Sequence, residues 1–303
     1  MHDVGAAPVT GARRADRHPE RAARLLPLVA LCLLGYLASP AAGKAHAASP
    51  AAVLRIAYTA ELRGNLQPCS CPANPLGGLA RRIGFLDSLR TAPDPAPLLV
   101  LDAGRMLPER DRFPRLPAGA FARLQDLTIE AAAEASYDAI LSDDGSIPDA
   151  RWIPPLQARR VEIAGKRIGI CALEERFDPL EAREAVGALG RVDLLILLCS
   201  ADLHYAMRAA KLLGARAAIV ARGADFDRPV LLDGVLFFGP GRDGRHTGYA
   251  RIEVRRGEAP RVLEGKLRAM DGSTPVDPQW QDRVERLLLE IDQESPGALA
   301  WGE

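Results

Sequence analysis

Apolar residues follow two different periods along the chain, and these periods separate predicted strands from predicted helices. Mostly apolar runs of strand length, each with a single charged residue, occur at residues 53–58, 98–104, 137–141, 192–198 and 216–221. Between these runs, apolar residues recur every three or four positions, as in an amphipathic helix, at residues 78–90, 118–135, 178–189 and 201–213. The pattern therefore predicts alternating strands and helices, the order of an α/β protein.

Hairpins are predicted in the second half of the chain. Polar and apolar residues alternate on both sides of Gly165 within residues 160–173, and Asp233-Gly234 is a favoured two-residue turn within residues 230–238. Further strands are predicted near 247–255 and 260–268, followed by a helix at 278–292. Because parallel-type units come first and hairpins later, we expect a mixed sheet or two packed mixed sheets with helices outside.

The first 47 residues have the pattern of an export signal. A basic start is followed by an apolar run at residues 25–38, and small residues then lead to Ala45-His46-Ala47, an A-x-A cleavage pattern. The apolar run is shorter than the roughly 20 residues that cross a membrane. We therefore predict a signal peptide at residues 1–47 and an exported protein, periplasmic or extracellular. An uncleaved N-terminal membrane anchor is the alternative, and it is the only membrane contact that we expect.

Charge and histidine content restrict the possible functions. The chain has 39 basic and 39 acidic residues; the leader holds six of the basic and three of the acidic ones, which leaves 33 against 36. This balance gives no electrostatic reason to expect a nucleic acid polymer as a partner. Only His204 and His246 of the five histidines follow the leader, so a mechanism that needs several imidazoles is disfavoured.

Several segments together resemble the 5′-nucleotidase/UDP-sugar hydrolase branch of the calcineurin-like metallophosphoesterases. They are TAELRGNLQP (59–68), GGLARR (77–82), LLVLDAG (98–104), YDAILSDDGS (137–146) and VDLLILLCS (192–200). The likeness covers about residues 53–255. It implies a single-domain, four-layer αββα sandwich at residues 48–270, in which two packed mixed sheets have helices outside, followed by a C-terminal helix and tail at 271–303. We expect no counterpart of the family's second, substrate-binding domain in this sequence.

The resemblance also implies a centre of two divalent metals, whose ligands are mostly Asp, Asn and His. This chain departs from the family at nearly every ligand position: it has Glu61, Arg63, Arg105, Asp144, Gly145, Ser200, Gly223 and Asp225 there, and Asp102 remains as the strand residue. An arginine at a ligand position puts a cation where two cations belong, a reversal of roughly several kcal/mol in a partly buried site. We therefore expect no metal cofactor. The alternative is a residual carboxylate site of Glu61, Asp144 and Asp225, suited to Mn, Mg or Ca.

Three arginines, Arg63, Arg105 and Arg222, map onto this former site. Two interpretations of them stay open. Together they could form an anion pocket for phosphate or carboxylate. In the other interpretation, which we favour, they pair with Glu61, Asp102 and Asp144 as an internal ion network.

Four cysteines follow the leader: Cys69, Cys71, Cys171 and Cys199. The sequence PCSCP at residues 68–72 resembles a subgroup of exported nucleotidase-like proteins with a Cys-rich loop after the first strand, some of them selenoproteins. The Cys69–Cys71 pair could staple this loop to another part of the chain, act as a redox dithiol or soft-metal site, or be inert. Cys171 and Cys199 lie on apolar strands and are expected in the core. Cys199 ends its strand and could approach the Cys69–Cys71 loop.

These observations lead to three hypotheses about function. The first, which we favour, is an exported, non-hydrolytic nucleotidase-like domain that acts as a binding or scaffold protein in the cell envelope. Its partner would be an envelope protein, including an electron-transfer assembly. The second is a divergent metal-dependent phosphoesterase that acts on nucleotides or sugar nucleotides. The third is a thiol redox or soft-metal-binding protein that works through Cys69 and Cys71.

Overall fold

The computed structural model describes residues 51–71, 73–142 and 145–299, and their backbone forms two six-stranded sheets. The predicted signal at 1–47 and the candidate ligand Asp144 lie outside the described residues. In the first sheet the strand order is β12-β11-β1-β2-β3-β4. Its strands are β1 (Ala52–Thr59), β2 (Leu98–Asp102), β3 (Ala139–Leu141), β4 (Trp152–Ile153), β11 (His246–Val254) and β12 (Arg261–Ala269).

The second sheet has the strand order β5-β6-β7-β8-β10-β9. Its strands are β5 (Ala158–Ile163), β6 (Lys166–Leu173), β7 (Leu194–Asp202), β8 (Ala217–Arg222), β9 (Val230–Leu232) and β10 (Val235–Phe238). Both sheets are mixed: β1 to β4 and the series β6-β7-β8-β10 run parallel, and hairpin strands are added antiparallel at the edges.

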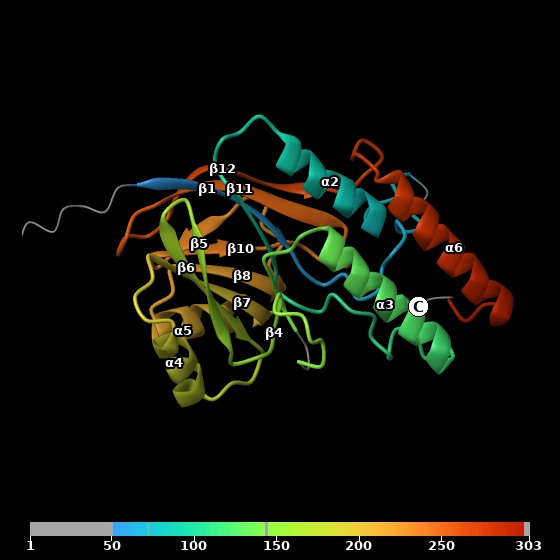
Figure 1. The fold of residues 1–303 in the computed structure, drawn as a ribbon, viewed down its shortest axis with the longest axis horizontal. Coiled ribbons are helices and arrows are strands. Elements are labelled where there is room, and N and C mark those ends of the chain that lie inside the picture. The colour runs from blue at the N-terminus through green and yellow to red at the C-terminus, as the bar shows by residue number, and fades with distance from the viewer. Residues whose placement is uncertain (1–50, 72, 143–144, 300–303) are drawn as a thin grey trace, which may run out of the picture. The chain divides into compact units, whose positions relative to one another are not determined.

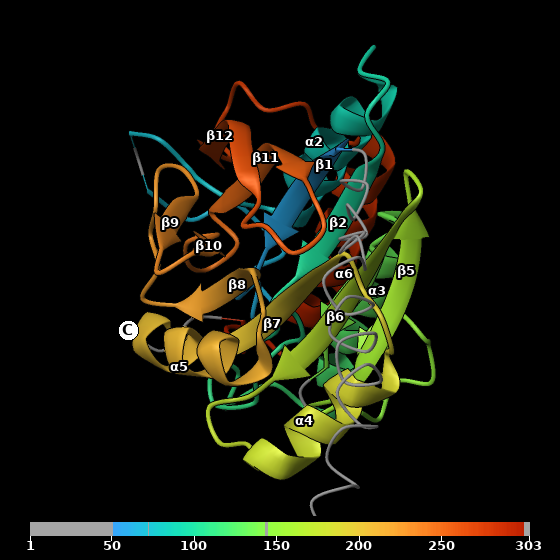
Figure 2. The same cartoon turned by 90° about the vertical axis from the view of Figure 1, so that its left-hand side faces the viewer.

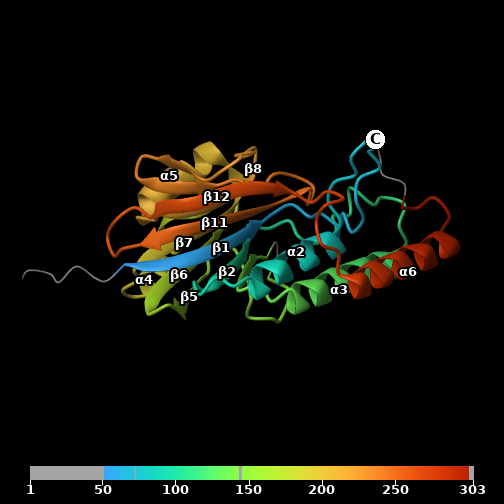
Figure 3. The same ribbon diagram turned by 90° about the horizontal axis from the view of Figure 1, so that it is seen from above.

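Helices cover the outer face of each sheet and complete four layers. Three of them lie together against the first sheet (Figures 1 and 3): α2 (Leu79–Thr91), α3 (Ala118–Glu134) and α6 (Pro278–Glu294). The other two lie along the second sheet (Figure 2): α4 (Pro179–Ala188) and α5 (Leu203–Leu213). The predicted αββα architecture, two packed mixed sheets with helices outside in one domain, is therefore confirmed. In the described part of the chain, no helix is long and apolar enough to span a membrane.

Side chains that alternate along the central strands hold the layers together. In β1, Ile56 and Tyr58 face the core between the two sheets, and Ala57 faces the core under α2, α3 and α6. In β7, Ile196 faces the first of these cores and Leu197 faces the core under α4 and α5. Strands with both faces buried read as continuous apolar runs, which is why they could be recognised in the sequence.

The loops that follow β1 and β2 stay paired beyond the ends of the strands, and this pairing positions the site. The Ala103 N–H donates to the Thr59 carbonyl, and the Glu61 N–H donates to the Gly104 carbonyl, each at 2.9 Å. The Arg63 N–H then donates to the carbonyl of Arg105 at 2.9 Å. Because the two strands run parallel, their polar end residues emerge side by side at one edge of the sheet.

The predicted elements are present, with ends shifted by a few residues, and one strand was missed. Strand β4 has only two residues, Trp152 and Ile153, within a loop that has no apolar period. Helix α6 packs against α2 and α3, and its Trp280 and Val284 belong to the same core as α2 and α3. The terminal helix is therefore part of the domain.

Candidate functional site

Arg105 joins two acidic side chains at the ends of β1 and β2. Its Nη1 donates to Glu61 Oε1 at 2.8 Å, and its Nε donates to Glu109 Oε1 at 2.7 Å. Arg63 approaches from the β1 loop, and its Nε donates to Glu109 Oε2 at 2.7 Å. Both carboxylates are thus held by guanidinium groups, which are strong, charge-assisted partners.

The two carboxylates respond to this environment in opposite ways. Burial raises the pKa of Glu61 above its ordinary value, and this effect outweighs the nearby charges of Arg105 and Arg63. Burial also acts on Glu109, but its hydrogen bonds to Arg105 and Arg63 together outweigh it, so that the pKa of Glu109 is lowered. Glu109 is therefore the favoured anionic partner in this ion network.

A second cluster surrounds the fully buried Asp102 at the end of β2. The Thr59 hydroxyl donates to Asp102 Oδ2 at 2.5 Å, and the Gly104 N–H donates to Asp102 Oδ1 at 2.8 Å. Arg82 is 1% exposed, and its Nη1 lies 3.8 Å from Asp102 Oδ2. Burial raises the pKa of Asp102, and the charge of Arg82 opposes this rise. Both Asp102 oxygens are engaged by groups of the protein itself.

Among the described residues, the structure does not bring the candidates Arg222, Asp225 and Ser200 into this network. Arg222 pairs with the exposed Glu175 at 2.9 Å rather than with Glu61 or Asp102, the two described acids that we expected as its partners. Asp225 pairs with Arg242 at 3.6 Å and is more than half exposed. Ser200 is partly buried on β7. In the described ranges, no group of three or more His, Cys, Asp and Glu side chains is arranged to hold a metal ion.

Sequence reasoning missed two members of these clusters, Glu109 and Arg82. Glu109 follows Arg105 by four residues, and Arg82 follows Leu79 by three on the predicted helix 78–90. The second spacing places Arg82 on the apolar face of the helix, together with Ile83 and Leu86. A charged residue on an apolar face was the signal that could have identified Arg82.

Cys69 and Cys71 form a close thiol pair in the loop after β1. Their sulfur atoms lie 2.9 Å apart, and the Leu76 N–H donates to Cys69 Sγ at 3.2 Å. Partial burial raises the pKa of Cys69, but its hydrogen bonds with Cys71 and with the Leu76 N–H outweigh this effect, so that its pKa is lowered. The hydrogen bond to Cys69 raises the pKa of Cys71, which stays exposed. Cys69 is therefore the first of the two to become a thiolate.

The other two described cysteines lie in a different layer. Cys171 and Cys199 are buried in the core under α4 and α5. Burial raises the pKa of each thiol to about 12. The expectation that Cys199 approaches the Cys69–Cys71 loop was wrong, because its side chain points to the helix-covered face of the second sheet.

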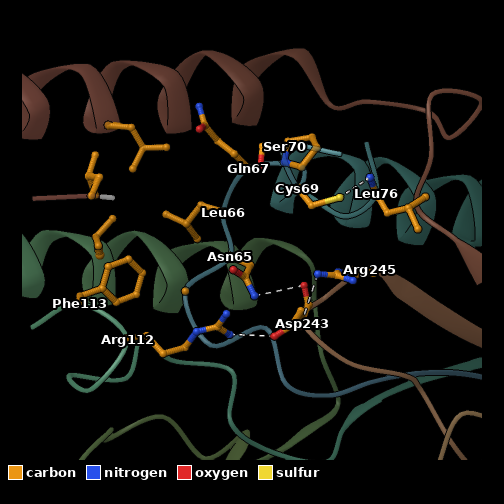
Figure 4. Close-up of a pocket in the computed structure, with 15 residues that line it drawn as sticks. Asn65, Leu66, Gln67, Cys69, Ser70, Leu76, Arg112, Phe113, Asp243 and Arg245 are labelled. Carbon is orange, nitrogen blue, oxygen red and sulfur yellow. Dashed lines mark hydrogen bonds and ion pairs between the residues drawn. The ribbon is translucent and has the colours of Figure 1, made fainter. Parts of the chain in front are cut away.

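A pocket of about 400 Å³ lies against the thiol loop, the segment between β1 and α2 that carries Cys69 and Cys71. One part of its wall is polar: Asp243 accepts from Arg112 Nη1 at 2.8 Å, and Arg245 Nη2 lies 3.8 Å from Asp243. Asn65 donates to the Asp243 carbonyl at 3.3 Å. Cys69 and Arg245 lie at one end of the pocket and Phe113 lies at the other (Figure 4).

Apolar residues from five parts of the chain form another part of the pocket wall: the thiol loop, the loop after β2, helix α3, helix α6 and the segment after α6. They are Leu66, Leu76, Phe113, Leu124, Leu288 and Leu299. The structure therefore combines a thiol, cationic groups and apolar surface in one cavity.

Solved structures share this fold. A 5′-nucleotidase precursor from Thermus thermophilus aligns with a TM-score of 0.61 and 18% identity over 80% of this chain and 59% of its own. The sulfate thiohydrolase SoxB from the same organism gives a TM-score of 0.61 and 11% identity over 82% of this chain and 61% of its own. The calcineurin-like phosphoesterase YfkN from Bacillus subtilis gives 0.58 and 14% over 81% of this chain and 99% of its own.

These likenesses show that the chain has the fold of the calcineurin-like metallophosphoesterases. The chain spans about three-fifths of the length of the nucleotidase and of SoxB. No protein-family model matches the sequence. No curated protein matches it either.

Glu109 and Glu61 offer a matched test of the ion network. We expect Glu109→Gln to lower the free energy of unfolding at pH 7 by about 1–3 kcal/mol, since it leaves two guanidinium groups without their shared charged partner. Glu61→Gln should cost clearly less, because burial already disfavours the Glu61 charge. Urea denaturation of both variants measures this difference.

The sign of the pH dependence follows from the lowered pKa of Glu109. Its stabilising contribution is present above the pKa of the unfolded carboxyl, about 4.3, and is lost as the pH falls through the lower folded value. The difference in the free energy of unfolding between wild type and Glu109→Gln should therefore become smaller as the pH falls below about 4.3. Equal losses for both variants at pH 7 would contradict the assignment.

Alkylation tests the predicted order of thiol reactivity. In the reduced native protein, Cys69 should react with iodoacetamide at lower pH than Cys71, because the thiolate is the nucleophile and the pKa of Cys69 is lowered. Cys171 and Cys199 should stay unlabelled until the protein is denatured, because both are buried. Peptide mass spectrometry across a pH series measures each site. Equal labelling of all four cysteines in the native state would refute this order.

Proposed function

We propose that this chain is an exported nucleotidase-like protein whose reactive group is the Cys69–Cys71 thiol pair. The observation that best supports this function is the 2.9 Å separation of the two sulfur atoms. A disulfide bond is about 2.05 Å long, so that a small rotation of each side chain is enough to close one. Such a bridge across one intervening residue is strained, and strained bridges are the readily reduced, catalytic kind.

The proposed reaction is thiol–disulfide exchange with a disulfide substrate. The Cys69 thiolate attacks one sulfur of the substrate, the substrate S–S bond breaks, and the first substrate thiolate leaves. Cys71 then loses its proton to solvent and attacks Cys69 Sγ in the mixed disulfide, and the second substrate thiolate leaves. Two electrons pass from the thiol pair to the substrate, and an exported redox partner reduces the protein disulfide again.

The same proposal assigns no phosphoester hydrolysis to the chain. Two-metal hydrolysis requires anionic or neutral ligands that face two cations. Here Glu61 is bound by Arg105, and Asp102 is bound by Thr59, Gly104 and the charge of Arg82. These residues do not fit a pair of divalent cations, and the residual Mn, Mg or Ca site is not part of the proposal.

The partner class follows from the location that the leader predicts. Exported thiols experience oxidising conditions, so that the pair needs an electron donor in the cell envelope to act repeatedly. We therefore propose an envelope protein, such as a member of an electron-transfer assembly, as the partner. The nucleotidase-like domain then serves as the scaffold that presents the thiol loop.

Metal analysis tests the loss of the hydrolytic site. Chelator-treated protein is incubated with manganese, iron or zinc, desalted and analysed, and its turnover of nitrophenyl phosphate is measured with manganese. We expect the protein to retain less than one equivalent of metal per chain, in an amount that substitution of Glu61 or Asp102 does not change. We also expect no turnover above the buffer rate. Two equivalents per chain that disappear in Asp102→Asn, or turnover that disappears in Glu61→Ala, would overturn this part of the proposal.

Trapping of the mixed disulfide tests the redox function. With hydroxyethyl disulfide, the wild-type protein should form an internal Cys69–Cys71 bridge and release two equivalents of mercaptoethanol. Cys71→Ser should stop at a mixed disulfide on Cys69, and the matched variant Cys69→Ser should react more slowly, because the pKa of Cys71 is raised. Mass spectrometry distinguishes these species. The proposal fails if the wild type forms no internal bridge.

A further inference from the structure

We propose that the pocket beside Cys69 is the substrate site of the thiol pair and binds a low-molecular-weight disulfide that carries a carboxylate. This inference rests on the proposed redox function and adds the class of its substrate. Three features support it: the size of the cavity, the charges in its wall and the position of Cys69.

The size of the cavity fits a small molecule. Its volume of about 400 Å³ lies within the roughly 300–1,000 Å³ that small-molecule sites occupy. The apolar wall, which includes Leu66, Phe113 and Leu288, offers contact to the carbon skeleton of a ligand. A folded protein that carries a buried disulfide could not place it inside such a cavity.

The charges in the wall favour an anion. The charged residues of the described wall are Arg112, Arg245 and Asp243, which leaves one surplus positive charge. Arg112 binds Asp243 directly at 2.8 Å, whereas Arg245 lies 3.8 Å from it and its side chain is 45% exposed. Arg245 is therefore the cation best placed to meet a carboxylate, with which a guanidinium forms a two-point contact.

The two cysteines differ in their position relative to the pocket. Cys69 is part of the wall, at the same end as Arg245 (Figure 4), whereas Cys71 is exposed and does not belong to the wall. A disulfide whose carboxylate contacts Arg245 thus meets Cys69 first. After exchange, Cys71 reaches the mixed disulfide from outside, and the released thiol leaves through the open side of the pocket.

The test compares three small disulfides of different charge: dithiodiglycolate (anionic), hydroxyethyl disulfide (neutral) and cystamine (cationic). The rate of Cys69–Cys71 bridge formation is measured for each disulfide by quenching and mass spectrometry. Each rate is then divided by the rate at which the same disulfide oxidises dithiothreitol under the same conditions. This division removes the intrinsic reactivity of each reagent. We expect the normalised rate for the anion to exceed that for the cation by about tenfold, to saturate with concentration, and to fall as salt screens the charges.

Arg245→Gln separates binding from thiol activation. Loss of the Arg245 charge disfavours the Cys69 thiolate and therefore slows the reaction with all three reagents alike. In addition, it should abolish the preference for the anion and raise KM for dithiodiglycolate. The matched control is Arg242→Gln, an exposed arginine of the same loop that does not line this pocket; it should keep the preference.

The outcomes for the substrate and for the redox function are distinguishable. Bridge formation with all three reagents at normalised rates that do not depend on their charge, or a preference that survives in Arg245→Gln, overturns the substrate assignment and leaves the redox function intact. Failure of every reagent to form the bridge overturns the redox function itself.

Discussion

The guanidinium of Arg105 holds together the loops that follow β1 and β2, and the rest of the site depends on this contact. It bridges Glu61 from the β1 loop and Glu109 from the β2 loop, so that a side chain joins two strand ends. In the described clusters, the positive charges of Arg63, Arg82 and Arg105 equal in number the negative charges of Glu61, Asp102 and Glu109. A partly buried group of charges is tolerated only when each charge has a partner. Hydrogen bonds join Arg63 and Arg105 to the two glutamates, whereas the buried Arg82 guanidinium makes no hydrogen bond to a described residue and faces Asp102 as an ion pair at 3.8 Å.

This arrangement has a cost in the backbone. Glu61, Arg63 and Arg105 have φ values of 49°, 52° and 57°, in the left-handed region that non-glycine residues rarely adopt. Each such conformation costs on the order of 1 kcal/mol and persists only where the surroundings enforce it. The backbone pairing of Glu61 with Gly104 and of Arg63 with Arg105 provides that enforcement. The backbone pairing and the ion network together therefore stabilise these strained conformations.

The order of elements could be predicted from the sequence, whereas the partners within the site could not. Apolar runs such as residues 192–198 identify doubly buried strands, because both faces must be apolar there. The partner of Arg105 is different: Glu109 lies in an irregular loop, and no period in the sequence says which carboxylate a long guanidinium will reach. Cys199 was misplaced for a related reason, since a shift by one residue along a strand moves a side chain to the opposite face.

The position of the thiol pair follows from the same geometry. The fold presents its reactive groups where strands end, because loops there are exposed while the sheets behind them are rigid. With Arg105 holding the strand ends together, the next exposed segment is the loop between the Pro68–Gly77 bridge partners, which carries Cys69 and Cys71. The Cys69 N–H donates to the Leu76 carbonyl at 2.8 Å, and the Leu76 N–H donates to Cys69 Sγ. The short Pro68–Gly77 bridge thus holds Cys69 through its own backbone, while Cys71 stays exposed. This arrangement is the one that the proposed exchange reaction requires of its attacking and its resolving cysteine.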